Sequence, residues 1–152
     1  MKNNFISEKI FGKQFFSKYY LVILGVILLT ISSKISIPFF PSPMTLQTLV
    51  VYFISSFMGI LGFRAIFIYL LFGILGLPIF SDGGGFEFVF SPNFGFLYGM
   101  LFASLTIFYI LKKGLNNFTK IFMSIFLGFC SMYIIGICHL SYFIGFQKAF
   151  MD

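Results

Sequence analysis

Residues 121–147, IFMSIFLGFCSMYIIGICHLSYFIGFQ, decide the fold, because they contain no Asp, Glu, Lys or Arg. A helix needs roughly 20 mostly apolar residues to cross the hydrocarbon core of a bilayer. This segment exceeds that length, and an uncharged run of this kind is typical of a membrane-spanning helix. The sequence therefore predicts a membrane protein.

Further uncharged runs extend the same pattern toward the N-terminus. Cutting the chain at its charges and prolines predicts five spans, near residues 19–37, 44–62, 64–80, 93–111 and 121–145. Short connections separate them, so the chain has no room for a soluble domain. We expect an all-α integral membrane bundle that forms a single transmembrane domain over residues 1–152.

The composition agrees with this fold class. Hydrophobic residues make up 59% of the chain and charged residues 9%, whereas a soluble domain carries about 25% charged residues. The mean hydropathy is +1.03, which leaves too little polar surface to cover a water-soluble body.

The basic residues predict the orientation, because Lys and Arg are enriched in cytoplasmic loops. With a cytoplasmic N-terminus, most of them face the cytoplasm: Lys2, Lys9, Lys13, Lys18, Arg64, Lys112, Lys113 and Lys120. Only Lys34 and Lys148 then lie outside. The net charge of +6 is therefore a topology signal, with the lipid bilayer as the partner and no nucleic acid.

Catalytic and metal-binding patterns are missing from the sequence. His139 is the only histidine, and there is no G-x-x-x-x-G-K-[ST], G-x-S-x-G or H-E-x-x-H pattern. We expect neither an enzyme nor a cofactor. His139 itself has two interpretations: it is either a proton relay or ligand contact, or a residue that hydrogen-bonds a neighbouring helix or lies at the membrane interface. Cys130 and Cys138 are too far apart on one helix to form a disulfide with each other.

Two polar stretches are candidate binding elements. Thr45, Gln47 and Thr48 open the second span, where they either line a pocket or serve as a helix cap and interhelical hydrogen bonds. The glycine-rich loop over residues 81–92 is either a ligand contact or a plain connection. By the charge argument both stretches lie on the outer side, which suggests capture of a small molecule from outside. Gly95 and Gly99 form a G-x-x-x-G pattern that favours close helix packing.

Three blocks of sequence resemble the BioY family. They are residues 35–38 with 43–49, residues 69–80, and residues 91–99, namely ISIP with PMTLQTL, YLLFGILGLPIF and SPNFGFLYG. BioY proteins are the biotin-binding substrate components of energy-coupling factor transporters. The resemblance covers about residues 20–145 and implies a multi-pass protein of the plasma (inner) membrane of a bacterium.

The resemblance also implies ligand and partner residues. Thr45, Gln47 and Asn93 would hydrogen-bond biotin, while Phe80 and Gly84 would shape the apolar wall of its site. The implied partners are a transmembrane coupling protein and ABC-type ATPases. Small residues of the first span, here Gly25, Ser32 and Ser33, would meet the coupling protein.

The C-terminus departs from the family pattern. BioY chains continue with a P-F-x-x-G-D-x-x-K-like segment and a sixth helix, and this sequence stops at Asp152 before any such motif. We therefore expect a chain shortened at its C-terminus, with five helices against six in the family. An alternative hypothesis is a non-functional truncated remnant, or a structural membrane protein without a ligand.

Overall fold

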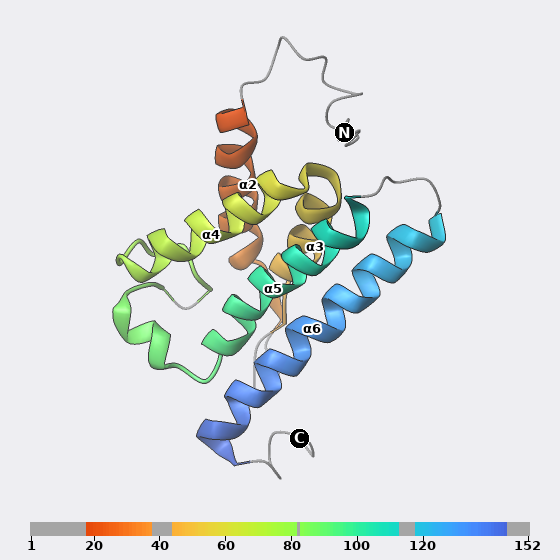
Figure 1. Cartoon of the computed structure of the whole chain (residues 1–152). Helices are drawn as coiled ribbons and strands as arrows, with labels where there is room; N and C mark the ends of the chain where they lie inside the picture. Colours follow the sequence, from red (N-terminus) through yellow and green to blue (C-terminus); the bar gives the residue numbers. More distant parts are fainter. Residues whose placement is uncertain (1–17, 38–43, 82, 113–117, 146–152) are drawn as a thin grey trace.

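The computed structural model describes residues 18–37, 44–81, 83–112 and 118–145. Its α-helices are α2 (Lys18–Ser33), α3 (Gln47–Met58), α4 (Ile60–Ile74), α5 (Phe94–Leu111) and α6 (Phe118–Ile144), with a 3-10 helix η1 at Phe86–Phe90. The helices pack as a bundle in which α5 and α6 run side by side (Figure 1). The predicted helical bundle is confirmed for this part of the chain.

A short β-hairpin joins α2 to α3, which the sequence did not predict. Strand β1 (Ser36–Ile37) pairs antiparallel with β2 (Met44–Thr45), with Ser36 opposite Thr45. The expectation of helix up to residue 37 and from residue 44 was therefore wrong. Since a residue before proline is restricted to extended conformations, Pro38 holds Ile37 out of the helical region.

The turn between α3 and α4 lies at Gly59, earlier in the chain than the predicted boundary near residue 63. Gly59 has φ 55° and ψ −122°, a conformation that glycine adopts without the steric cost of a Cβ. Close packing follows the turn, because a Cβ added to Gly62 would lie 2.6 Å from the carbonyl oxygen of Ile54.

The helices differ in length. Among the described residues, Phe94–Leu111 and Phe118–Phe143 are long and apolar enough to cross a membrane by length and composition, and the other three apolar helices have 10–17 residues. Helix α3, with 12 residues, extends only about 18 Å at 1.5 Å per residue. The hairpin and the glycine turn account for the difference, because they take residues that the prediction assigned to helix.

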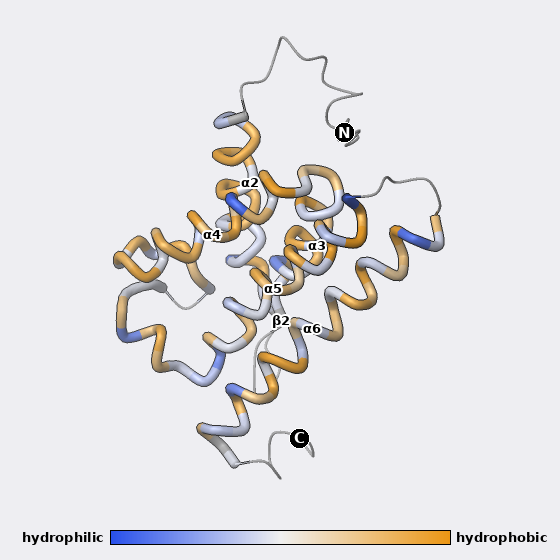
Figure 2. Tube along the Cα trace, in the orientation of Figure 1, coloured by the Kyte–Doolittle hydropathy of each residue, from blue (hydrophilic) through white to orange (hydrophobic). Residues whose placement is uncertain are grey.

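The core lies where α2, α3, α4 and α5 meet. Leu29, Val51, Ala65 and Tyr69 are completely buried there. Large apolar side chains also cover the outside of the bundle, and Figure 2 shows hydrophobic colour along every helix. An exterior of this kind matches a hydrocarbon surrounding rather than water.

Basic residues gather at one end of the bundle. The start of α2, the α3–α4 turn, the end of α5 and the start of α6 all point toward the top of Figure 1. These ends bring Lys18, Arg64, Lys112 and Lys120 to one side, which we call the basic end. The hairpin, η1 and the start of α5 lie at the opposite end.

Glycines on α5 set its distance to α6. A Cβ on Gly95 would lie 2.4 Å from Cβ of His139, and a Cβ on Gly99 would lie 2.9 Å from the carbonyl oxygen of Met132. The predicted role of the G-x-x-x-G pattern in helix packing is confirmed.

Candidate functional site

The carbonyl oxygen of Ile79 is the centre of a polar cluster at the end opposite the basic end. The hydroxyl of Tyr69 donates to it over 3.0 Å and that of Ser33 over 2.7 Å. Both hydroxyl-bearing residues are fully buried, and the side chain of Gln47 lies beside the Tyr69 hydroxyl. This Ile79 cluster joins the end of α2, the start of α3, helix α4 and the segment after α4.

Phe80 closes the apolar side of the Ile79 cluster. Its ring is 1% exposed and lies 5.4 Å, centroid to centroid, from Tyr69 and 5.0 Å from Phe88. Glycine is required beneath it, since a Cβ on Gly73 would lie 2.0 Å from Cζ of Phe80. The ammonium group of Lys34 donates to the carbonyl oxygen of Phe80. The segment after α4 is therefore fixed against α2 by both polar and apolar contacts.

Gln47 brings an unpaired donor to this cluster. Its side chain is 3% exposed, and its amide nitrogen Nε2 has no hydrogen-bond partner among the described residues. The N-cap residue of α3 is the apolar Leu46, and no side chain forms a capping hydrogen bond with the helix. The helix-cap interpretation of this polar stretch is thus wrong. A buried amide without a partner costs about 1–3 kcal/mol, so Gln47 is suited to a ligand acceptor.

A second polar cluster joins α5 to α6. Nδ1 of His139 lies 2.8 Å from the hydroxyl of Tyr98, and Nε2 lies 3.3 Å from the carbonyl oxygen of Ser91. The neighbouring-helix interpretation of His139 is confirmed. This His139 cluster fixes the Ser91–Pro92–Asn93 turn that precedes α5.

Asn93 contributes an unpaired acceptor at the same turn. It is the N-cap residue of α5, yet its side chain makes no capping hydrogen bond. Its carbonyl oxygen Oδ1 is buried without a partner among the described residues, as is Oγ of Ser91. The carboxamide of Asn93 therefore retains an acceptor for a ligand donor.

The remaining predicted residues lie around these clusters in different ways. Gly84 is exposed, and a Cβ there would lie 2.0 Å from the carbonyl oxygen of Leu77, so local packing already requires the glycine. Thr45 is half-buried in β2 opposite Ser36. The structure brings Gln47 and Phe80 together around Tyr69. Asn93 lies in the turn that the His139 cluster fixes. Phe88 of η1 connects this turn to Phe80, because its ring contacts the Phe80 ring and its carbonyl oxygen accepts a hydrogen bond from the backbone N–H of Ser91.

Sequence reasoning missed Tyr69 as a site residue and misassigned Ser33. Gly25 and Ser33 were expected to meet a partner protein, but a Cβ on Gly25 would lie 2.7 Å from Cβ of Ala65, and Ser33 is 0% exposed. Both residues face the inside of the bundle, as does Ser32 at 3% exposure.

The arrangement offers hydrogen bonds and apolar contacts. The described residues contain no group of three or more His, Cys, Asp or Glu side chains placed to hold a metal ion. An amide donor from Gln47, an amide acceptor from Asn93 and the rings of Phe80 and Phe88 suit a neutral ligand that carries both a hydrogen-bond acceptor and a donor.

The family model and the similar proteins that match this chain all point to the same family. The BioY family model matches residues 5–151. A probable biotin transporter BioY of Pyrococcus horikoshii is 32% identical over 86% of this chain and 78% of its own length. The biotin transporter BioY of Rhizobium etli is 32% identical over 83% of this chain and 74% of its own length.

A solved structure has the same fold. The S-component for biotin from an ECF-type ABC transporter superimposes with a TM-score of 0.74, over 85% of this chain and 74% of that chain. The sequence identity is 22%, so this likeness concerns the fold alone.

Proposed function

The chain belongs to the BioY family, and from this premise we propose that it binds biotin as the substrate-binding component of an energy-coupling factor transporter. The observation that supports the proposal is the pair of buried, unpartnered amide groups, Nε2 of Gln47 and Oδ1 of Asn93. Both residues begin helices at the same end of the bundle. Both amides gain their missing partners if a ligand binds there.

The ureido head of biotin is chemically complementary to these two groups. The ureido carbonyl oxygen accepts a hydrogen bond from Nε2 of Gln47. A ureido N–H group donates a hydrogen bond to Oδ1 of Asn93. A site that leaves its own polar groups unpaired when empty discriminates strongly against ligands that lack the matching group. Thr45 adds a hydroxyl for hydrogen bonding, and Phe80 and Gly84 shape the apolar wall.

The proposal includes a membrane arrangement. Residues 1–152 form a single multi-pass domain in the plasma membrane of a bacterium, with the basic end in the cytoplasm. The starts of α3 and α5 then face the outside. Helix α3 is shorter than the membrane is thick, so Gln47 lies below the outer surface. Non-helical backbone at that depth is tolerated where it lines a cavity, and strands β1 and β2 before α3 pair with each other through Ser36–Thr45 and Ile37–Met44.

The partners in this proposal are a transmembrane coupling protein and ABC-type ATPases. The sequence lacks a phosphate-binding loop of its own, so ATP hydrolysis requires another chain. Because Gly25 and Ser33 are buried, the coupling surface in this proposal is the exposed face of α2 that carries Ile27 and Ile31.

Radiolabelled biotin binding to the chain in lipid nanodiscs tests the function. We expect saturable binding that Gln47→Leu and Asn93→Leu each weaken about 10-fold or more, since losing a buried hydrogen-bond partner costs about 1–3 kcal/mol and 1.4 kcal/mol is tenfold in affinity. Thr106→Val is the matched control, because Thr106 donates to the carbonyl oxygen of Phe102 in its own helix.

The variants must retain the thermal unfolding transition of the parent chain for the comparison to hold. A folded chain that binds no biotin would contradict the proposal and would support the alternative of a structural protein without a ligand. Saturable binding that is equal in all variants would contradict the roles of Gln47 and Asn93 but not the binding of biotin itself.

A further inference from the structure

A separate cavity opens between α2 and α4, close to the basic end. Its volume is about 380 Å³, and it is lined by Tyr19, Val22, Ile23, Leu61, Phe63, Arg64, Phe67 and Ile68. Small-molecule sites typically occupy about 300–1,000 Å³. None of its lining residues belongs to the Ile79 or His139 clusters, so this cavity is distinct from the proposed biotin site.

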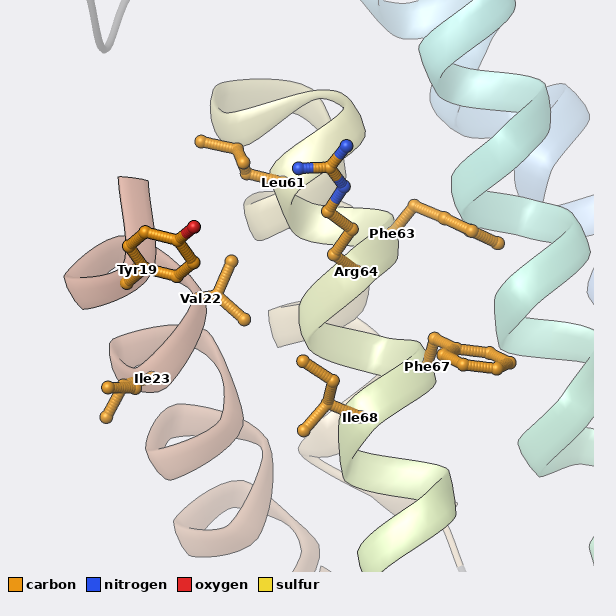
Figure 3. A pocket seen from close by; sticks show the side chains of 8 residues that line it. All are labelled: Tyr19, Val22, Ile23, Leu61, Phe63, Arg64, Phe67 and Ile68. Atoms are coloured by element: carbon orange, nitrogen blue, oxygen red, sulfur yellow. The ribbon is translucent and has the colours of Figure 1, made fainter. Parts of the chain in front are cut away.

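The lining divides into a polar mouth and an apolar floor. Figure 3 shows the hydroxyl of Tyr19 and the guanidinium of Arg64 at the same end of the cavity, with Ile23 and Ile68 further along the two helices. Tyr19 is the second residue of α2 and Arg64 the fifth of α4. The cavity therefore becomes more apolar from the basic end toward the middle of the bundle.

The charge of Arg64 is not compensated within the described part of the chain. Arg64 is exposed, and no carboxylate there forms a salt bridge with it. Glu87, the acidic residue that the structure describes, belongs to η1 at the opposite end of the bundle. A guanidinium over an apolar cavity is complementary to an anion whose remainder is apolar, because an inorganic anion would leave the apolar walls uncovered.

We propose that this cavity binds an anionic phospholipid, with its phosphate at Arg64 and the Tyr19 hydroxyl and one acyl chain along Val22, Ile23, Phe67 and Ile68. Arginine matches a phosphate through two parallel hydrogen bonds. Basic pockets between transmembrane helices suit acidic lipid headgroups. A second protein helix in the same place would cover the apolar floor but would leave the Arg64 charge unpaired.

Native mass spectrometry of the full chain, released from detergent after incubation with phosphatidylglycerol or phosphatidylcholine, tests the lipid site. We expect the parent chain to retain phosphatidylglycerol in preference, and Arg64→Gln to lower that preference about 10-fold. Lys112→Gln is the matched control, since Lys112 is an exposed cation at the same end and lies outside the cavity lining. Equal loss in both variants would overturn the site in favour of general charge attraction.

Two further arms distinguish the source of the phosphate and the occupant. Excess inorganic phosphate should not displace the lipid, and displacement would show that a free anion suffices. Ile68→Trp fills the floor without changing charge and should also reduce phosphatidylglycerol retention; unchanged retention would overturn the acyl-chain position. Because the cavity is separate from Gln47 and Asn93, Arg64→Gln should leave biotin affinity unchanged, so the two proposals fail independently.

Discussion

His139 on α6 and Tyr98 on α5 form a hydrogen bond of 2.8 Å between Nδ1 and the phenolic oxygen, with their rings perpendicular at 5.4 Å between centroids. The second ring nitrogen of His139 reaches the carbonyl oxygen of Ser91. One side chain thus connects the two longest helices and the turn that presents Asn93.

Replacing either partner should loosen this connection. Tyr98→Phe removes one hydrogen bond and should cost about 1 kcal/mol, whereas His139→Ala removes two and leaves a gap against Gly95, so its loss should be larger. Thermal unfolding in detergent measures both, with Ser141→Ala as control because Ser141 donates to Cys138 in its own helix. Equal, negligible shifts in all three variants would contradict the connecting role.

The contact of Gly95 with α6 predicts a strong effect of a single methyl group. Gly95→Ala places its Cβ 2.4 Å from Cβ of His139, a distance that requires the helices to separate. We expect a lower unfolding temperature and weaker biotin binding, because the Asn93 turn moves with the start of α5. Phe102→Ala serves as the control on the exposed face of α5, where lipid replaces the lost ring.

Gly73 should be equally intolerant of a side chain, for a different reason. A Cβ there overlaps the Phe80 ring at 2.0 Å, so Gly73→Ala should expel Phe80 from the Ile79 cluster. The expected result is a loss of stability of about 1–3 kcal/mol, partly restored in the double variant Gly73→Ala, Phe80→Leu. If the second substitution adds its own loss instead of restoring stability, the overlap is not the cause.

The two donors to the carbonyl oxygen of Ile79 should be coupled. Tyr69→Phe and Ser33→Ala each leave one donor in place, whereas the double variant leaves the carbonyl without either hydroxyl. The double loss should therefore exceed the sum of the single losses, by about 0.5–3 kcal/mol in a double-mutant cycle. Ser124→Ala is the matched control, since Ser124 is equally buried and donates to Ile121 in its own helix. Additive losses would contradict a shared acceptor.

Several details of the fold could not be predicted from the pattern of apolar residues alone. Charges and prolines indicated separate apolar runs around α2, α3 and α4 but misplaced the ends of these helices, because the hairpin strands Ser36–Ile37 and Met44–Thr45 and the turn at Gly59 contain no charged residue. The G-x-x-x-G pattern indicated close packing and did not name its neighbour. Gln47 and Asn93 were predicted as polar site residues from the outer face that they share and from the resemblance to BioY proteins, while the unpaired state of their amides follows only from their surroundings.

The sequence by itself determined that this protein is a helical membrane bundle of the BioY type, because long uncharged runs and local motifs are properties of consecutive residues. Only the tertiary structure decided which polar atoms remain without partners, that Ser33 and Gly25 face inward, and that Tyr69 and Ile79 meet across helices. These features depend on contacts between residues far apart in the chain, for instance Ser33 with Ile79, and periodicity within one segment contains no information about such distances.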